Sequence, residues 1–394
     1  MKNRLPLALA ALAALSTSGC LGVGHNAPKP GLTYVGNRPV TLPCRILDNV
    51  PIVEAKWDKF GPYHFVVDTG SSVTLVSPEL AARYVSGSSP IPSLPQVRVR
   101  SAEGGSTLLN SVTLQKIQLG KARFEYVPAL VYDCTDLSAQ FGVKIDGILG
   151  FPLFQNAVLT IDYPHERIVL RSRIPDDGLP GEAILFNNAD KTPLIPIRLG
   201  DREFAALIDS GSSSAIAINP AGLAPRFSYG PVDGPTIGTL TGDRTTRVGR
   251  LADVVRMGSF DIPHPVADLT DELSSLGGGI LGHFTVTFDQ EHDEVFFQLD
   301  PSEPLSMPPL RGTGLSFRKT PAYWKVAGVV PGSPADASGT RPGDLVSRIN
   351  GEPVDNWGLP RFERQVATSG RIEFTFIDGT KETVRPIPVV DLVP

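Results

Sequence analysis

The chain has 394 residues and a formal net charge of -5, with 41% hydrophobic and 20% charged residues. This length exceeds one comfortable hydrophobic core, so we expect two or three folded domains. The acidic balance disfavours a nucleic-acid-binding protein. The 39 glycines and 37 prolines, set between apolar stretches too short for long helices, indicate many short strands joined by turns. The fold class is therefore expected to be mainly β.

The N-terminus has the pattern of an export signal, which we assign to residues 1–19. Two basic residues precede an apolar run from Leu5 to Leu15, which is too short to span a bilayer as a permanent helix. The run ends in LSTSGC, which resembles a bacterial lipoprotein cleavage site and implies a lipid on Cys20. Plain secretion is the alternative, because Thr17 stands where the lipoprotein pattern prefers leucine.

Export would place the protein in the cell envelope, on the periplasmic or extracellular side of a bacterial membrane. Residues 20–39 are rich in glycine and proline, so we expect a flexible tether to the lipid anchor. Removing residues 1–19 takes away two positive charges and no acidic residue, which changes the net charge from -5 to -7. No nucleic-acid partner is expected of such a chain.

Two cysteines, Cys44 and Cys134, remain after the proposed lipidation site. In an oxidising compartment an even pair can form one disulfide, and the alternative is two separate buried thiols. The six histidines lack metal-binding spacing, and no paired Cys/His motif is present. We therefore expect no metal and no cofactor.

The central part of the chain contains an internal repeat. The first copy, residues 40–173, carries FVVDTGSS at 65–72 and then the predicted helix SPELAARY at 77–84. A glycine-bearing hairpin and the apolar run DGILG at 146–150 follow. Its closing hairpin contains TID at 160–162, and residues 174–181 form a linker rich in proline, glycine and aspartate.

The second copy, residues 182–300, repeats these elements in the same order. It carries ALIDSGSS at 206–213, then NPAGLAPRF at 219–227, a turn TGDR, and GGGILG at 277–282. Its closing hairpin contains TFD at 287–289. The first copy has a longer segment after its ILG, FPLFQNAVL, in which we expect a short helix that the second copy lacks.

These motifs resemble aspartic peptidases of the retropepsin and pepsin type, over about residues 45–300. In both copies, two hydrophobic residues precede Asp-Thr/Ser-Gly-Ser, and a hydrophobic-hydrophobic-Gly run follows about 70 to 80 residues later. The runs are Ile148-Leu149-Gly150 and Ile280-Leu281-Gly282. The resemblance implies a bilobal acid-protease fold made of two duplicated retropepsin-like β lobes. Both lobes lie in one chain, so a monomer suffices.

Asp68 and Asp209 are the expected catalytic residues. Peptide hydrolysis at mild pH needs a base to activate water and an acid to protonate the leaving group. Two carboxylates a few ångströms apart supply both functions, because like-charge repulsion keeps one proton on the pair, as in the well-known aspartic protease dyad. The titration then belongs to the pair and not to either residue.

Six residues of the two loops are expected to support the dyad. Glycines permit close backbone approach and donate N–H bonds to the carboxylates. The resemblance implies that the Thr69 and Ser210 hydroxyls bond across the lobe interface, that Ser71 and Ser212 bond the outer carboxylate oxygens, and that the ILG runs pack as strands beneath the loops. The supporting residues are Thr69, Gly70, Ser71, Ser210, Gly211 and Ser212.

Substrates of such enzymes lie extended between the dyad and a hairpin flap, and pair with the protein by main-chain strand addition. The expected partners are extended peptides or unfolded protein segments. Neither hairpin carries the tyrosine of pepsin flaps, so two hairpins closing together is the better analogy. The flap candidates are Glu103, Gly104, Gly105, Thr241, Gly242 and Asp243.

A linker at 301–311 leads to a segment of different character, residues 312–394. It contains GTGLSF at 312–317 and a turn-rich stretch to residue 354, and it resembles a PDZ domain, a small β barrel with helices. The pattern also predicts a groove helix at 359–367 and a strand with alternating apolar residues at 372–376. Asn350-Gly351 and Asp378-Gly379 are favoured two-residue hairpin turns.

The resemblance implies that four residues of this segment bind a peptide ligand, through backbone N–H groups and strand pairing. Ser316 departs from the glycine common at its position, which favours strand addition over recognition of a free carboxylate. A domain used only as a spacer or regulatory contact is the alternative. The four residues are Gly314, Leu315, Ser316 and Phe317.

Two functions from different classes fit this sequence. The first is a cell-envelope aspartic endopeptidase whose PDZ domain binds or positions substrate. The second is a catalytically weak or inactive protein that captures extended peptides in the lobe cleft and the PDZ groove. A serine hydrolase is disfavoured because no Gly-x-Ser-x-Gly elbow is present.

Overall fold

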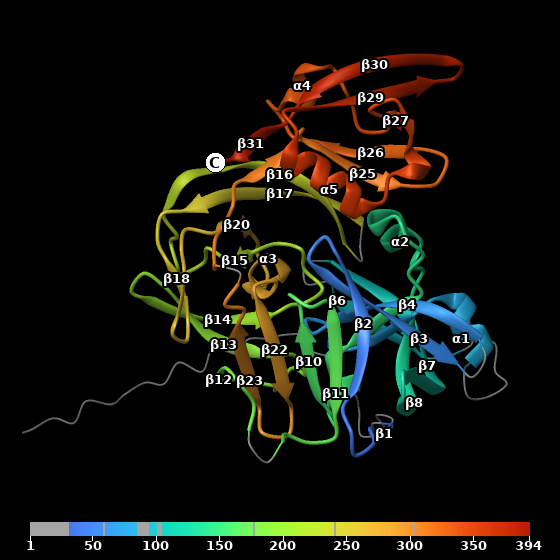
Figure 1. Ribbon diagram of the computed structural model, residues 1–394, viewed down its shortest axis with the longest axis vertical. Helices are drawn as coiled ribbons and strands as arrows, with labels where there is room; N and C mark the ends of the chain where they lie inside the picture. The colour runs from blue at the N-terminus through green and yellow to red at the C-terminus, as the bar shows by residue number, and fades with distance from the viewer. Residues whose placement is uncertain are drawn as a thin grey trace, which may run out of the picture.

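A computed structural model describes residues 31–57, 60–84, 94–100, 105–175, 178–239, 242–302 and 304–394. The protein is mainly β, and two lobes carry a C-terminal domain that lies across both of them (Figure 1). No helix within the described residues has the length and apolar character needed to cross a membrane. The proposed export signal and residues 20–30 lie outside the described ranges.

Lobe one begins with a strand inside the segment that we expected to be a tether. Residues 32–34 form β1, which pairs antiparallel with β8, so the tether is shorter than predicted. The predicted helix at 77–84 is confirmed as α1. The elements are β1 (Leu32–Tyr34), β2 (Val40–Leu47), β3 (Val50–Trp57), β4 (Phe60–Asp68), β5 (Thr74–Val76), α1 (Pro78–Tyr84), β6 (Gln96–Arg100), β7 (Ser106–Leu119), β8 (Ala122–Val131), α2 (Thr135–Phe141), β9 (Gly147–Gly150), η2 (Phe151–Phe154), β10 (Val158–Asp162) and β11 (Arg167–Arg171).

Lobe two repeats most of this order, and it departs from the sequence-based prediction at two places. The residues matched to α1, at 219–227, form turns that lead into β16, and no helix lies there. The short helix that we expected only in lobe one has a counterpart in lobe two, because α3 follows β21 as η2 follows β9. The elements are β12 (Glu182–Leu185), β13 (Leu194–Leu199), β14 (Arg202–Ile208), β15 (Ile216–Ile218), β16 (Phe227–Thr239), β17 (Gly242–Leu251), β18 (Val255–Met257), β19 (Phe260–Ile262), β20 (Val266–Leu269), β21 (Ser275–Leu276), α3 (Gly278–Leu281), β22 (Phe284–Asp289) and β23 (Glu294–Leu299).

A shared antiparallel sheet joins the lobes. Its strands run in the order β12-β23-β22-β10-β11-β2, and β10 of lobe one pairs with β22 of lobe two at the centre. Thr160 lies opposite Thr287 in this register, and their hydroxyl oxygens are 2.9 Å apart. Most buried apolar residues of the two lobes form one continuous core cluster, so the loops that carry Asp68 and Asp209 share a common base.

The C-terminal domain has its own core, centred on Trp324, Phe317 and Phe374. It begins slightly before the predicted residue 312, because β24 pairs with β31. The predicted groove helix and the alternating strand are confirmed as α5 and β29. The elements are β24 (Leu310–Gly312), β25 (Leu315–Lys319), β26 (Trp324–Val329), α4 (Pro334–Ala337), β27 (Leu345–Ile349), β28 (Glu352–Pro353), η3 (Val354–Asn356), α5 (Leu359–Thr368), β29 (Arg371–Asp378), β30 (Lys381–Pro388) and β31 (Val390–Val393).

Candidate active site

Asp68 and Asp209 each end a buried strand at the same kind of junction. Asp68 is the last residue of β4, whose preceding residues Phe65 to Val67 are buried, and β4 pairs in parallel with β9. Asp209 follows β14, whose residues Ala206 to Ile208 are buried, and β14 pairs in parallel with β21. In both lobes a neighbouring parallel strand therefore fixes the end of the strand that delivers the carboxylate.

The two carboxylates meet at the lobe interface. A methyl group added at Gly70 would lie 2.5 Å from Asp209 Oδ1, and one added at Gly211 would lie 2.5 Å from Asp68 Cγ. Each carboxylate therefore lies against the glycine of the opposite loop. Any larger side chain at either position would collide with the pair, which is why the motif needs glycine there.

Backbone donors hold each carboxylate in place, as predicted. The Gly70 N–H donates to Asp68 Oδ1 at 2.8 Å, and the Gly211 N–H donates to Asp209 Oδ1 at 3.0 Å. Burial raises the pKa of Asp68 to about 6, against the lowering effect of hydrogen bonds with Gly70, Asp209 and Ser71. Because desolvation exceeds these contributions, the pair keeps a proton well above the ordinary range of a carboxylic acid.

Thr69 and Ser210 form a reciprocal hydrogen-bond network between the loops. The Thr69 hydroxyl donates to the Ile208 carbonyl at 2.6 Å and accepts from the Ser210 N–H at 3.0 Å. The Ser210 hydroxyl donates to the Val67 carbonyl at 2.8 Å and accepts from the Thr69 N–H at 2.9 Å. Both side chains are fully buried, so these four bonds rigidly fix one loop against the other.

The serine that follows each glycine acts through its backbone. The Ser71 hydroxyl donates to the Val73 carbonyl at 2.8 Å, and the hydrogen bond of Ser71 that lowers the pKa of Asp68 comes from its backbone. The Ser71 carbonyl accepts from the Phe151 N–H at 2.9 Å, and the Ser212 carbonyl accepts from the Gly278 N–H at 2.8 Å. These bonds tie each loop to its own η2 or α3. The predicted bond of Ser212 to the carboxylate stays a prediction.

The glycine beneath each loop was matched incorrectly in lobe two. A methyl group added at Gly150 would lie 2.3 Å from the Val73 carbonyl oxygen, and one at Gly277 would lie 2.3 Å from the Ser214 carbonyl oxygen. Ser275-Leu276-Gly277 is therefore the counterpart of Ile148-Leu149-Gly150, and β21 takes the place of β9. The run at 280–282, which we expected to be the strand, belongs instead to α3 and the residue after it.

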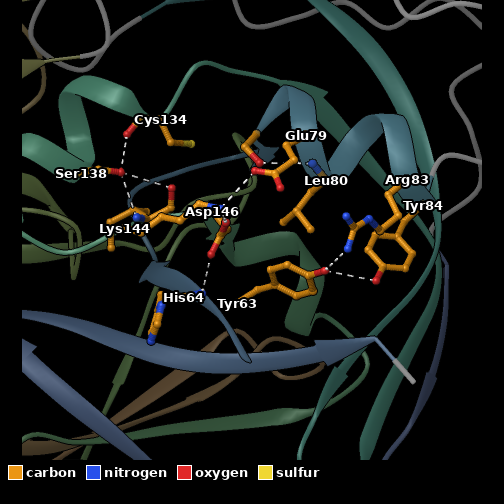
Figure 2. Close-up of polar contacts among 12 residues, drawn as sticks. Tyr63, His64, Glu79, Leu80, Arg83, Tyr84, Cys134, Ser138, Lys144 and Asp146 are labelled. Atoms are coloured by element: carbon orange, nitrogen blue, oxygen red, sulfur yellow. Dashed lines mark hydrogen bonds and ion pairs between the residues drawn. The ribbon is translucent and has the colours of Figure 1, made fainter. Parts of the chain in front are cut away.

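A polar network around the buried carboxylate of Asp146 lies next to β9 (Figure 2). Asp146, which directly precedes β9, accepts a hydrogen bond from the His64 N–H of β4 at 2.9 Å and pairs with Lys144 at 3.2 Å. The exposed Lys144 also pairs with the exposed Glu79 of α1 at 3.0 Å. The network joins β4, β9 and α1, and no sequence motif marks Asp146, so it was not predicted.

Two hairpins lie at the positions predicted for flaps. In the first, β6 and β7 pair up to Arg100 and Ser106, and in the second Thr239 lies opposite Gly242. Gly105 and Gly242 have positive φ values of 81° and 127°, which favour glycine in these turns. Three flap candidates lie outside the described residues: Glu103, Gly104 and Thr241. Asp243 is the second residue of β17.

Both hairpins contact parts of the protein beyond their own lobe. Arg100, at the end of β6, pairs with Glu272 of lobe two at 2.7 Å. Asp243 of lobe two pairs with Arg318 of the C-terminal domain. These ion pairs were not predicted, because two opposite charges that lie far apart in the chain form no pattern within a short segment of sequence.

The predicted PDZ groove residues lie at the start of β25. Gly314 has a φ of 91°, and its carbonyl accepts from the Val330 N–H at 2.8 Å. Phe317 is buried in the domain core. The Ser316 hydroxyl accepts from the Thr236 N–H of lobe two at 3.0 Å, a contact within the protein that the sequence did not predict. Peptide binding by these residues stays a prediction.

Cys44 and Cys134 are separate buried thiols, so the disulfide alternative is corrected. Burial raises the pKa of each thiol to about 12, which makes both of them unreactive. Across the part of the chain that the structure describes, no three His, Cys, Asp or Glu side chains are grouped so that they could hold a metal ion.

Comparison with known proteins agrees with this geometry. Residues 53–153 match the family model described as aspartyl protease, and residues 308–374 match the model described as PDZ domain. No curated protein matches the chain. The protein therefore contains an aspartyl protease domain of the retropepsin-like kind and a C-terminal PDZ domain. The match to the first model ends in lobe one, and the structure adds the second carboxylate from lobe two.

Proposed function

We propose that this protein is an aspartic endopeptidase that cleaves extended peptide or unfolded protein segments with the Asp68/Asp209 dyad. One observation carries the proposal: each carboxylate lies against the glycine of the opposite loop, within a reciprocal network of buried hydrogen bonds. A pair of ordinary strand-to-turn junctions would not require this mutual fit. Both carboxylates come from one chain, so a monomer is sufficient for activity.

The geometry accounts for the chemistry of general acid and general base catalysis. At mildly acidic pH the pair holds one proton, because burial opposes a second negative charge. The ionised carboxyl takes a proton from a water that attacks the peptide carbonyl carbon, and the protonated carboxyl donates its proton to the carbonyl oxygen. Collapse of the tetrahedral intermediate then transfers a proton to the leaving amine and restores the singly protonated pair.

The PDZ domain is proposed to bind or position substrate. Strand β25 pairs with β26 along one edge, and among the described residues no strand pairs with its other edge. A peptide can add to such an edge by main-chain hydrogen bonds, with side chains received between β25 and α5. Ser316 already bonds to lobe two in this structure, which favours strand addition further along β25 over carboxylate capture at its start.

We further propose that the protein acts in the bacterial cell envelope with a lipid on Cys20. The support is the sequence pattern at residues 1–20 and the glycine- and proline-rich segment that follows. Replacing Cys20→Ala in the natural host is expected to move the protein from the membrane fraction to the soluble fraction. A variant that still sediments with membranes would contradict the anchor.

The test of catalysis uses protein that starts after Cys20 and a diverse peptide pool, with products read by mass spectrometry from acidic to neutral pH. Asp68→Asn and Asp209→Asn are each expected to lower the cleavage rate about 10³-fold, because either change removes the shared proton arrangement. Asp261→Asn is the matched control, since this carboxylate is exposed and pairs only with Arg256 at the surface. Its cleavage rate should be unchanged.

The opposite outcome favours the second function. If the protein retains peptides in pull-down experiments but cleaves none at any pH, the lobe cleft is a capture site and the peptidase proposal is overturned. Capture that persists in Asp68→Asn and Asp209→Asn would agree with this result, because strand addition does not depend on the carboxylates.

A further inference from the structure

The C-terminal domain contacts both lobes through β25, next to the cleft. Figure 1 shows α2 of lobe one and the β16–β17 hairpin of lobe two beside β25 and α5, and contacts between these elements agree with the view. A PDZ domain that only bound a ligand would need contact with one neighbouring element. Here its contacts connect the β16–β17 hairpin of lobe two to α2 of lobe one.

The lobe-two hairpin is held at three points. The Thr236 N–H of β16 donates to the Ser316 hydroxyl at 3.0 Å, and Asp243 at the start of β17 pairs with Arg318. A methyl group added at Gly328 of β26 would lie 1.9 Å from the Thr236 hydroxyl oxygen. Gly328 therefore lets the hairpin approach the backbone of the domain closely.

Helix α2 of lobe one is held by the same strand. Arg318 donates to the Asp136 carbonyl at 2.9 Å, and the Lys319 ammonium donates to the Gln140 carbonyl at 2.6 Å. Both acceptors belong to α2, and the Gln140 carbonyl lies near the C-terminal end of this helix, where a cation is stabilised. Leu359, the first residue of α5, packs in a cluster with Phe141 of α2.

Helix α2 is itself firmly attached to lobe one (Figure 2). The Ser138 hydroxyl donates to the Cys134 carbonyl at 2.7 Å and accepts from the Ile145 N–H at 2.9 Å, directly before the network of Asp146. Ser138 therefore ties α2 to the segment that leads into β9, which gives the C-terminal domain a support on lobe one.

Arg318 is the residue at which the three parts meet. Its side chain is 16% exposed and contacts Asp243 of the hairpin and Asp136 of α2. The hairpin and α2 also approach each other here, because a methyl group added at Gly238 would lie 2.8 Å from both the Gln140 side-chain oxygen and an Arg318 nitrogen. The lobe-two hairpin, α2 of lobe one and the C-terminal domain thus meet at one place.

We propose that the C-terminal domain is a latch that holds the lobe-two hairpin closed against α2, and that release of β25 opens the cleft to an extended chain. The latch itself is a statement about the fold, and only its consequence for cleavage rests on the proposed peptidase function. A peptide that pairs with β25 would compete with the contacts made by Arg318 and Lys319, so ligand binding and cleft opening are coupled.

The first measurement is amide hydrogen exchange on protein that starts after Cys20, which needs no catalytic activity. Gly328→Ala inserts a methyl group between the domain and the hairpin, and the amides of β16, β17 and α2 should exchange about tenfold faster. The double variant Gly328→Ala/Thr236→Gly removes the colliding side chain and should restore slow exchange. Arg348→Ala is the control, because this exposed arginine bonds only within the domain and its loss should change nothing.

Arg318→Ala gives an independent test in case Gly328→Ala distorts the domain core. It should accelerate exchange in the same hairpin and helix, and Asp243→Ala combined with it should add less than the sum of the two single effects. Unchanged exchange of β16 and β17 in both Gly328→Ala and Arg318→Ala would overturn the latch.

Cleavage of unfolded casein separates failure of the latch from failure of the proposed function. With an active dyad, Gly328→Ala and Arg318→Ala should cleave casein severalfold faster than the unchanged protein and Arg348→Ala. Faster hairpin exchange without cleavage by any variant would keep the latch and overturn the peptidase. Equal cleavage rates together with unchanged exchange would overturn the latch and keep the peptidase.

Discussion

The two lobes build the same Asp-Thr/Ser-Gly loop on different supports. In lobe one a four-residue strand, β9, lies beneath the loop and is anchored by the buried carboxylate of Asp146. In lobe two a two-residue strand, β21, and the glycine-rich α3 occupy the same place. The difference teaches that the site depends on a few backbone positions, chiefly Gly150 and Gly277, and tolerates different residues around them.

The hairpins differ in a second way. The lobe-one hairpin reaches lobe two through the exposed Arg100, a contact of the kind that stabilises little. The lobe-two hairpin is held by the C-terminal domain through the largely buried Arg318. The two hairpins are therefore held unequally, and the lobe-two hairpin is the one tied to the added domain.

The largest expected effect tests the symmetry of the buried network between the lobes. Thr69→Ala and Ser210→Ala should each lower the free energy of unfolding by about 2–4 kcal/mol, since each leaves a buried N–H and a buried carbonyl unpaired. Thr69→Ser keeps the hydroxyl and should cost about 1 kcal/mol. Denaturant titration measures all three, and a clearly smaller loss for one alanine variant would break the symmetry.

The second prediction tests which glycine of lobe two corresponds to Gly150. Gly277→Ala should destabilise by about 1–3 kcal/mol, as should Gly150→Ala, because the added methyl group meets a backbone carbonyl in each case. Gly282→Ala should stay within about 1 kcal/mol, since its methyl group would lie 2.9 Å from the Gly278 carbonyl oxygen, against 2.3 Å at the other two positions, and its φ of -55° is helical. Thermal unfolding of the three variants gives the comparison, and a larger loss at Gly282 would restore the original match.

The third prediction concerns pH. The pKa of Asp68 is raised from 3.8 to about 6 in the folded protein, so the folded state holds a proton that the unfolded chain releases in this window. This contribution to stability is fully present below pH 3.8 and is lost as the pH rises through about 6. Peptide cleavage should fall about tenfold per pH unit above the same value, as the pair loses its shared proton. A pH–rate profile that stays flat into the alkaline range would contradict this.

The smallest expected effect lies in lobe one, which holds both free thiols. A reductant should leave the unfolding midpoint unchanged, because no disulfide links Cys44 to Cys134. Thiol reagents should label neither residue in the folded protein, since burial raises both pKa values to about 12. A midpoint that falls in reductant would show that the two thiols are joined in solution.

Much of the site followed from local sequence. The strands that end in Asp68 and Asp209 and the glycines that donate to them were predicted, because the alternation, turn residues and spacing of a repeated motif are properties of short segments. The resemblance to known families implied the bonds of Thr69 and Ser210 and the PDZ domain, and the hydrogen bonds and the family match agree with it. Local sequence did not show that Ser71 bonds Asp68 through its backbone while its hydroxyl donates to the Val73 carbonyl.

The sequence by itself determined the duplication, the dyad and the C-terminal domain, since each leaves a pattern within one continuous stretch. Only the tertiary structure decided that Gly277 and not Gly282 corresponds to Gly150. The residues at 280–282 are the same Ile-Leu-Gly as at 148–150, but their backbone belongs to helix α3 and its end and not to a strand. It also decided that Arg318 joins the hairpin of one lobe to a helix of the other. Such contacts form between residues far apart in the chain, where packing and charge select partners that no local pattern records.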